Sequence, residues 1–348
     1  MFENFLSVCK DVTKTTRKIP QGEYLSDGTY KIFDQGKNYI GGYCNTANGV
    51  ASDYPYIVFG DHTRVIKYIN EPCYIGADGV KLLKVYNNDF IPKFVYYAML
   101  ANPVEHQGYS RHFKLLKETK IRKYDKSIQN TIIDELDKIN LAISLKESIL
   151  NHLDELVKSR FIEMFGTLDL SIQGESWLPL SEISTIYTGT TPSTKEKENW
   201  DGKIPWITPA ELSEDSFFVF DSERKITEKG LKSKSLSLMP KNTVLLSTRA
   251  PIGKVAIAGI EMCCNQGFKN FHCNNTILNP IYLYTLLKNN NEYLNSLGTG
   301  TTFKEISKTN VSKIKVPVAN ISLQNEFADF VKLIDKSKFV GYFTPVSY

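Results

Sequence analysis

The residue types that usually perform covalent chemistry form no catalytic pattern in this 348-residue chain. It has no Gly-x-x-x-x-Gly-Lys-Ser/Thr phosphate loop, no Gly-x-Ser-x-Gly nucleophile turn and no His-Glu-x-x-His zinc pair. Asn102-Pro103 and Asn279-Pro280 lack the second proline and the aromatic residue with which amino-methyltransferases hold a flipped base. The five histidines have no catalytic partner visible in the sequence. These absences favour a binding protein over an enzyme.

The six cysteines also lack a chemical pattern, since no Cys-x-x-Cys occurs and no Cys/His group has zinc spacing. We therefore expect reduced structural thiols, no bound metal and a cytoplasmic protein. The N-terminus has no basic segment followed by an apolar stretch, and no run of 18 apolar residues occurs. The sequence therefore predicts neither a signal peptide nor a membrane span.

A long internal repeat is the main organising feature of the chain. Gly79 and Gly267 lie in similar apolar surroundings, and the period between them is far too long for a solenoid. We interpret the repeat as a duplicated globular module followed by a helix, which suits two similar readers of one extended target. The other matches are Phe113-Lys114 with Phe303-Lys304, Thr119 with Thr309 and Lys123 with Lys313, which share one offset, and Ser127-Ile128-Gln129-Asn130 with Ser322-Leu323-Gln324-Asn325, whose offset is slightly larger.

Helical periodicity begins at each Ser-x-Gln-Asn segment. The first predicted helix, Ser127 to Phe165, is a rod of roughly 57 Å with a narrow apolar stripe that needs a partner helix. The second runs from Ser322 to about Phe339, before Gly341, and spans roughly 27 Å. We expect it to pack antiparallel near Leu150, Leu153 and Val157. A second copy of the chain or another subunit would then cover Ile128, Ile132, Leu136, Ile139 and Ile143.

The segments around these helices have a mixed texture. Strands are predicted at residues 56–59, 65–69, 244–247 and 255–258, and helices at 94–100 and from Pro280. The fold class is thus α+β, with two similar mixed α/β domains and long helices that form an antiparallel coiled coil. The predicted divisions are a first domain (1–125), a long spacer helix (126–166), a second domain (167–320), and a short second spacer helix with a tail (321–348).

Charge is distributed unevenly along the chain. The net charge is +4 over residues 1–125, −2 over 126–165 and +2 over 166–320. The basic excess therefore lies in the two domains and suits a polyanionic partner. Differences of this size are equally common on surfaces without such a partner.

The whole arrangement resembles the specificity subunit of type I restriction–modification systems, most clearly in the second module. The segments that carry the resemblance are Leu180-Ser181-Glu182-Ile183, Thr188-Gly189-Thr190-Thr191-Pro192-Ser193, Gly202-Lys203-Ile204-Pro205-Trp206-Ile207, Ile226-Thr227-Glu228-Lys229-Gly230-Leu231, Leu238-Met239-Pro240-Lys241 and Ser322-Leu323-Gln324-Asn325. The first module has no clear Gly-Thr-Pro-Ser or Pro-Trp segment, so its place in the comparison depends on the repeat and the helix.

The resemblance implies two target-recognition domains that each read one half of a split sequence in double-stranded DNA. The helices would act as a ruler and as a docking surface for modification subunits. Those subunits would carry the S-adenosylmethionine site, and a restriction subunit would supply ATP-driven motor and nuclease activity. The chain itself would be non-catalytic and would hold no cofactor. A half-site separation near one turn of DNA, about 34–36 Å, suits the length of the rod.

Base readers are expected among polar and cationic loop residues, because base edges are read by hydrogen bonds. Arg64 and Arg249 are favoured since both follow a threonine near a strand end. Each candidate is otherwise a solvated surface residue, and Trp200 and Trp206 suit a core role better than DNA stacking. The loop 298–302 could hold a phosphate through its amides or simply lead to the second helix. The candidates are Lys37, Tyr39, Asn45, Asn48, His62 and Arg64 in the first module, and Thr191, Lys195, Lys197, Lys203, Arg249, Lys254 and Lys269 in the second.

Two other functions remain open. The chain could be the recognition portion that works with a fused nuclease–methyltransferase. A neighbouring gene that encodes such a fused enzyme would favour this alternative. It could also be a sugar- or protein-binding scaffold, which an absence of salt-dependent DNA binding would favour.

Overall fold

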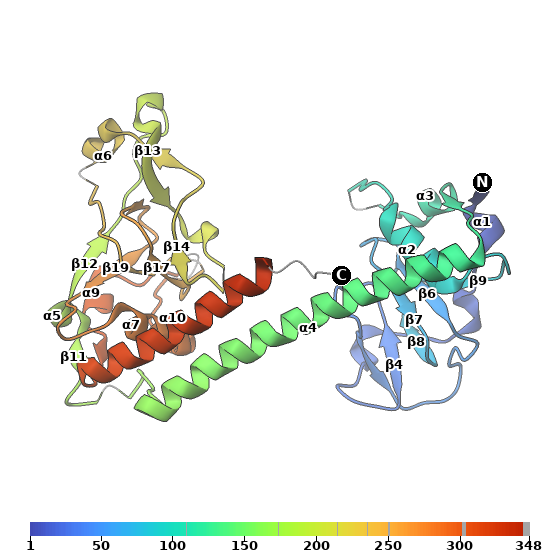
Figure 1. Ribbon diagram of the computed structural model, residues 1–348, viewed down its shortest axis with the longest axis horizontal. Helices are drawn as coiled ribbons and strands as arrows, with labels where there is room; N and C mark the ends of the chain where they lie inside the picture. The colour runs from blue at the N-terminus through green and yellow to red at the C-terminus, as the bar shows by residue number, and fades with distance from the viewer. Residues whose placement is uncertain are drawn as a thin grey trace. The chain divides into compact units, whose positions relative to one another are not determined.

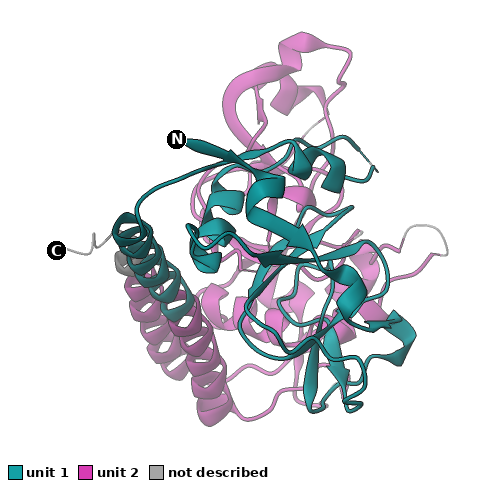
Figure 2. Ribbon diagram, turned by 90° about the vertical axis from the view of Figure 1, so that its right-hand side faces the viewer, with its two compact units in different colours: residues 1–145 teal, residues 146–348 magenta. Residues whose placement is uncertain are grey.

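The computed structural model describes residues 1–343 except positions 109, 173, 214, 235, 250 and 301–303. The chain divides into an N-terminal unit, Met1–Leu145, and a C-terminal unit, Lys146–Tyr348. The boundary falls within one helix, α4 (Lys126–Phe165), where the ribbon changes colour in Figure 2. Each unit is described separately below.

The N-terminal unit (Figure 1) contains two four-stranded sheets and the two-stranded sheet β1–β10. The sheet of order β2-β9-β6-β7 is antiparallel, whereas the sheet of order β3-β8-β4-β5 contains the parallel pairs β3–β8 and β4–β8. Every residue of β6 is buried, which explains its uninterrupted apolar run. The elements are β1 (Phe2–Asn4), α1 (Phe5–Val8), β2 (Cys9–Asp11), β3 (Lys18–Ile19), β4 (Tyr30–Phe33), β5 (Gly42–Cys44), β6 (Tyr56–Gly60), β7 (Ile66–Ile69), β8 (Cys73–Gly76), β9 (Val80–Val85), α2 (Pro92–Ala101), α3 (Phe113–Lys117) and β10 (Lys120–Arg122).

The C-terminal unit has a five-stranded sheet of order β12-β19-β16-β17-β14 and a three-stranded sheet of order β15-β13-β18. Its largest core lies between the five-stranded sheet and α7, which is buried from Ile281 to Leu287. The elements are β11 (Leu178–Pro179), α5 (Leu180–Ile183), β12 (Ser184–Thr188), β13 (Trp200–Ile207), β14 (Phe218–Val219), β15 (Lys225–Ile226), α6 (Glu228–Ser233), β16 (Val244–Leu246), β17 (Val255–Ala258), β18 (Cys263–Cys264), β19 (Lys269–Cys273), α7 (Pro280–Asn289), α8 (Asn291–Ser296), α9 (Lys308–Ser312), β20 (Lys315–Val316) and α10 (Ile321–Phe343).

The two units repeat one topology. The strand order β12-β19-β16-β17 matches β2-β9-β6-β7, and the antiparallel pair β11–β20 matches β1–β10. The Asp61 amide donates to the Gly79 carbonyl at 2.7 Å, and the Thr248 amide donates to the Gly267 carbonyl at 2.8 Å. The equivalence of the two glycines predicted from the sequence therefore agrees with the backbone.

Part of the predicted repeat was aligned wrongly. The Phe5 amide donates to the Thr119 carbonyl at 3.0 Å, and the Leu180 amide donates to the Ile314 carbonyl at 2.9 Å. Thr119 is thus equivalent to Ile314 and not to Thr309. The sequence separation between Thr119 and Ile314 equals the separation between the two Ser-x-Gln-Asn segments. The sequence similarity between Phe113-Lys114 and Phe303-Lys304 gave the wrong alignment, because α9, the counterpart of α3, begins only at Lys308. Phe303 lies outside the described residues.

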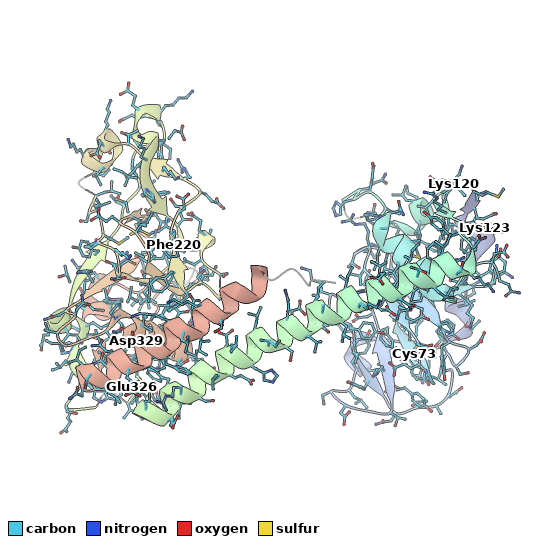
Figure 3. The ribbon with its side chains drawn as sticks, viewed as in Figure 1. Cys73, Lys120, Lys123, Phe220, Glu326 and Asp329 are labelled. Carbon is cyan, nitrogen blue, oxygen red and sulfur yellow. The ribbon has the colours of Figure 1, made fainter. Side chains whose placement is uncertain are left out.

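Helices α4 and α10 pack antiparallel within the C-terminal unit, as their ribbons show in Figure 1. Arg160 near the end of α4 contacts Glu326 near the start of α10 at 3.1 Å, whereas the earlier residue Asp154 contacts the later residue Lys338. Glu326 and Asp329 lie on α10 in Figure 3. The antiparallel pair that the periodicity predicted is therefore present.

Aromatic rings hold this helix pair to the second core. Phe161 of α4 lies with its ring centroid 5.3 Å from that of Phe327 on α10 and 5.5 Å from that of Tyr282 on α7. The α10 helix continues to Phe343, so its predicted end near Phe339 was wrong. A single glycine such as Gly341 weakens a helix by about 1 kcal/mol but need not end it.

Candidate nucleic-acid interface

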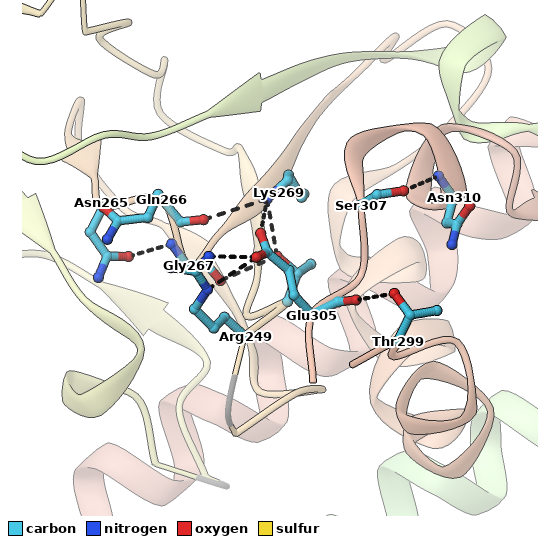
Figure 4. Close-up of polar contacts among 10 residues, drawn as sticks. Arg249, Asn265, Gln266, Gly267, Lys269, Thr299, Glu305, Ser307 and Asn310 are labelled. Atoms are coloured by element: carbon cyan, nitrogen blue, oxygen red, sulfur yellow. Dashed lines mark hydrogen bonds and ion pairs between the residues drawn. The ribbon is translucent and has the colours of Figure 1, made fainter. Parts of the chain in front are cut away.

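Three loops of the C-terminal unit meet where β16 ends, and the backbone fixes their arrangement. Thr248 donates its amide to Gly267 and accepts the Ile306 amide at 2.8 Å. Arg249 and Glu305 face each other as an isolated antiparallel bridge. The loops after β16, before β19 and before α9 are thereby held side by side (Figure 4).

A charged cluster occupies this junction. The Arg249 guanidinium donates to Glu305 Oε2 from Nε at 3.1 Å and from Nη2 at 2.6 Å. The Lys269 ammonium lies 3.4 Å from Glu305 Oε1 and donates at 3.4 Å to the Thr248 hydroxyl and the Gln266 carbonyl. Two cations thus share one carboxylate, which leaves the Arg249–Lys269–Glu305 cluster one positive charge in excess.

The electrostatics of the cluster follow from this sharing. Burial alone would raise the pKa of Glu305, but the hydrogen bond from Arg249 and the charges of Lys269 and Arg249 outweigh it and lower that pKa. Lys269 is only 7% exposed, so its ammonium group adds positive charge to the cluster but is hardly accessible to a ligand. Arg249, whose side chain is 45% exposed, is the cation of the cluster that a ligand can reach.

A fourth loop joins the cluster through Thr191, whose hydroxyl donates to Gln266 Oε1 at 2.7 Å. This loop approaches the backbone very closely, since a Cβ at Gly189 would lie 2.1 Å from the Cys264 carbonyl oxygen. Only glycine fits there. The structure therefore brings together Thr191, Arg249 and Lys269 among the predicted base readers.

The two tryptophans support the same loop from inside. Trp206 Nε1 donates to the Thr190 carbonyl at 3.0 Å, and Trp200 Nε1 donates to the Ser193 carbonyl at 3.1 Å. Both rings are nearly buried, and the Arg224 guanidinium lies 3.5 Å from the Trp200 ring centroid. The core role anticipated for these rings is the one the structure shows.

The remaining candidates of the second domain have no hydrogen bond or ion pair with the Arg249–Lys269–Glu305 cluster among the described residues. The Lys254 ammonium donates to the carbonyls of Pro209 and Leu212 and so stabilises a turn. Lys195, Lys197 and Lys203 are exposed, with Lys197 at the start of a 3-10 helix (Lys197–Asn199) and Lys203 on β13.

In the N-terminal unit, several predicted readers are engaged internally. Arg64 has a left-handed backbone (φ +62°), and its Nη1 donates to the Val104 carbonyl at 3.0 Å. The Tyr39 hydroxyl donates to the Tyr68 carbonyl, and Asn45 Oδ1 accepts the Thr29 amide at 2.9 Å. Arg64, Tyr39 and Asn45 therefore have structural roles, because their side chains make hydrogen bonds within the N-terminal unit.

The other three candidates of this unit keep an accessible position. Lys37 and Asn48 are exposed, and His62 is partly exposed. His62 follows Asp61 as Arg249 follows Thr248, and both preceding residues make the same backbone bonds to a glycine carbonyl. His62 is thus the topological counterpart of Arg249.

Comparison with known proteins finds similarities to proteins of one kind. Residues 177–339 match the type I restriction modification DNA specificity domain. The chain is 27% identical over 334 residues to the Escherichia coli type I restriction enzyme EcoR124I/EcoR124II specificity subunit, covering 90% of this chain and 80% of that subunit. The second domain thus matches a type I restriction modification DNA specificity domain, and the chain is similar along most of its length to a type I specificity subunit.

Two further similarities agree with this result. The MjaIX specificity subunit of Methanocaldococcus jannaschii is 37% identical over 185 residues, which are 52% of this chain and 43% of that subunit. The chain thus spans less than half the length of this relative. The crystal structure of a type I S subunit from M. genitalium has the same fold, with a TM-score of 0.63 at 15% identity over 98% of this chain and 91% of that one.

The docking stripe predicted on α4 is only partly uncovered. Ile132 and Leu136 pack against the N-terminal core, and Ile133 beside them is 8% exposed. The buried face of α4 is therefore turned by one residue from the predicted one. Four apolar residues one or two helical turns further along are 48–60% exposed: Ile139, Leu141, Ile143 and Leu145. Ile128 is exposed as well.

A groove of about 530 Å³ lies within the C-terminal unit between α4, α7 and α10. Leu150, Val157 and Ile334 form part of its apolar wall. Burial, together with the charges of Asp154, Asp215 and Asp335, raises the pKa of Tyr284 in this groove. The groove therefore combines apolar residues with charged residues of both signs.

The thiols of the described residues have no visible chemical role. Cys9, Cys73, Cys263, Cys264 and Cys273 are buried, and burial raises the pKa of each to about 12. Within the described ranges, no three His, Cys, Asp or Glu side chains gather as a metal site would require. No helix among these residues is long and apolar enough to cross a membrane.

Sequence reasoning missed Glu305, Gln266 and two buried glutamines, Gln129 and Gln324. An acidic residue is not an obvious choice for a site that meets a polyanion, so Glu305 gave no signal. The glutamines did give one, because each stands third in a repeated Ser-x-Gln-Asn segment.

Proposed function

We propose that the chain is the sequence-reading subunit of a type I restriction–modification complex. Its two domains contact the two halves of a split site in double-stranded DNA. Modification subunits dock on the helices and carry S-adenosylmethionine, and a restriction subunit with ATPase and nuclease activity joins them. The observation that carries this proposal is the repeated topology, in which each domain is joined to its own spacer helix.

The reading surface we infer for the second domain is the Arg249–Lys269–Glu305 cluster with Thr191. Arg249 presents N–H groups on Nη1 that the bonds to Glu305 do not use, and arginine reads guanine through such groups. Glu305 orients the Arg249 guanidinium through two hydrogen bonds, and Lys269 balances the Glu305 carboxylate so that the cluster stays positively charged. Lys195, Lys197 and Lys203 serve as phosphate contacts on the same domain.

In the first domain, we assign the corresponding place to His62, and Lys37 and Asn48 are the other accessible candidates of that domain. Arg64, Tyr39, Asn45 and, in the second domain, Lys254 would need to break internal hydrogen bonds to reach DNA.

The test is methylation by the reconstituted complex. The purified chain alone should show no methyltransferase, nuclease or ATPase activity, and adding a cognate modification subunit should produce S-adenosylmethionine-dependent methylation at one split sequence. Sequencing that detects methylated adenine across a host genome reads out the site. Methyl transfer by the chain alone would contradict the assignment, and so would an absence of salt-dependent DNA binding by the assembled complex.

A further inference from the structure

Each spacer helix begins with one buried glutamine among exposed neighbours. Gln129 in the first turn of α4 and Gln324 in the first turn of α10 are both 0% exposed. The residues on either side of Gln129, Ile128 and Asn130, are exposed. A polar side chain buried at such a place needs hydrogen-bond partners.

Gln129 makes three hydrogen bonds to the backbone of its own unit. Its Nε2 donates to the carbonyls of Asp89 at 2.7 Å and Tyr124 at 2.8 Å. Its Oε1 accepts the Ile91 amide at 2.8 Å. The side chain therefore joins the start of α4 to the segment that leads into α2.

Gln324 makes the same three bonds in the other unit. Its Nε2 donates to the carbonyls of Ile277 at 3.0 Å and Ala319 at 2.7 Å, and its Oε1 accepts the Asn279 amide at 2.9 Å. The sequence separation of Ile277 from Asp89, and of Asn279 from Ile91, equals that of Gly267 from Gly79. The separation of Ala319 from Tyr124 equals that of Gln324 from Gln129. The joint is thus duplicated atom by atom.

Glutamine suits this joint because its amide supplies two donors and one acceptor group, and the joint presents two carbonyls and one amide. The amide belongs to the residue before the proline that opens α2 or α7 (Ile91 or Asn279). Those two helices pack on the sheets, so the glutamine connects a domain's core to its spacer helix through rigid backbone.

We propose that Gln129 and Gln324 are positioning residues that fix the orientation of each recognition domain on its spacer helix, and thereby the number of base pairs allowed between the two half-sites. This inference rests on the proposed function. One base pair advances the duplex by about 3.4 Å. A joint that lets a domain tilt by a comparable distance at its reading surface would accept more than one gap length.

Both joints have secondary anchors, so their loss need not unfold a domain. In the N-terminal unit, Asp137 of α4 contacts Lys93 and Tyr97 of α2 at 2.6 and 2.5 Å. In the C-terminal unit, the rings of Phe161 and Phe327 clamp α4 and α10 to α7. A glutamine variant should therefore loosen an angle while the sheets stay folded.

The first experiment measures the joint without DNA. Spin labels on Lys37 and Ser144, both exposed and in the same unit, report the distance between the first domain and α4. Gln129→Met keeps the volume of the side chain but removes its donors and acceptor, and it should broaden the distance distribution. Asn130→Ala, at the exposed neighbouring position, should leave it unchanged. An unchanged distribution in a folded Gln129→Met protein would overturn the proposal.

The second experiment measures the gap. The complex with modification subunits is offered a library in which the spacing between the two half-sites varies by single base pairs. The unaltered chain should methylate one spacing, and Gln129→Met and Gln324→Met should each accept adjacent spacings at least 10-fold better while keeping both half-site sequences.

Retention of a single spacing by both folded variants would overturn the inference, as would a relaxed half-site sequence at the unaltered spacing. If Gln129→Met fails to fold, Gln324→Met decides the question. Failure of the unaltered complex to methylate any library member would count against the proposed function instead, and the spin-label result would still judge the joint.

Discussion

Arg64 and Arg249 show how far residue type alone can identify a functional side chain. Both follow a threonine near the end of a buried strand, and both were expected to face DNA. Arg64 instead donates to the carbonyl of Val104, 40 residues away, whereas Arg249 remains partly exposed beside Glu305. The difference is set by contacts distant in sequence, which a local pattern does not contain. Sequence reasoning could thus pick out both arginines, but it could not show which of them stays accessible, and it could not identify Glu305, to which Arg249 donates.

At this scale we predict that Arg249→Ala weakens binding to the cognate second half-site by about 1–3 kcal/mol, because a bidentate contact to guanine is lost. Binding curves at several salt concentrations, with cognate and scrambled half-sites, measure the effect. Arg249→Lys is the matched control, since it keeps the charge but not the fork of donors. If the lysine variant binds normally and the alanine variant loses affinity equally on all sequences, Arg249 contacts phosphate.

At the scale of elements, periodicity predicted α4, α2, α7 and the strands β6, β7, β16 and β17 well. These elements have long apolar runs or clear caps, such as the prolines that open α2 and α7. Short strands such as β3 (two residues) could not be found this way, because their pairing with β8 is decided by residues far away along the chain. The face that α4 buries was misplaced by one residue for the same reason, since the shape of the N-terminal core selects Ile133.

The anchor between α4 and α2 gives a pH-dependent prediction. Burial alone would raise the pKa of Asp137, but hydrogen bonds from Lys93 and Tyr97 and the Lys93 charge lower it overall. A carboxylate with a lowered folded pKa stabilises the fold above its unfolded pKa, about 4, and loses this contribution as the pH falls through the folded value. Asp137→Asn should therefore reduce the unfolding free energy of the first domain by about 0.5–1 kcal/mol at pH 7.

Hydrogen exchange of α2 amides and thermal unfolding between pH 3 and 7 would measure this difference, which should shrink below pH 4. Asp134→Asn, at an exposed position on the same helix, is the control. An equal effect of Asp137→Asn at pH 3 and pH 7 would show that packing, not charge, holds the two helices together.

At the scale of the whole molecule, the duplicated architecture fits the proposed role of a two-part reader. Each domain has its own sheets, its own core and its own glutamine joint, so the domains can diverge in their loops while the frame stays the same. The helices are then the surface common to both halves of the site. On that view, partner subunits should bind where the helices expose apolar residues.

The uncovered residues of α4 make this testable. Four apolar side chains between Ile139 and Leu145 remain about half exposed. Ile139 and Ile143 lie four residues apart and share one face of the helix, as an interface stripe would. Ile143→Asp should abolish stable assembly with the modification subunit, because a charge would be buried without a partner. Ser144→Asp, exposed at the adjacent position, should leave assembly intact. Leu136 is unsuitable for the test, since it packs on the N-terminal core and its loss would act on folding as well.

Sedimentation of the chain alone and mixed with the modification subunit separates the possible outcomes. A loss of the mixed complex with an unchanged sedimentation coefficient for the isolated chain assigns the patch to the modification subunit. A dimer of the isolated chain that Ile143→Asp converts to monomer assigns it to a second copy. Normal assembly of the aspartate variant in both measurements would show that this part of α4 faces solvent in the complex.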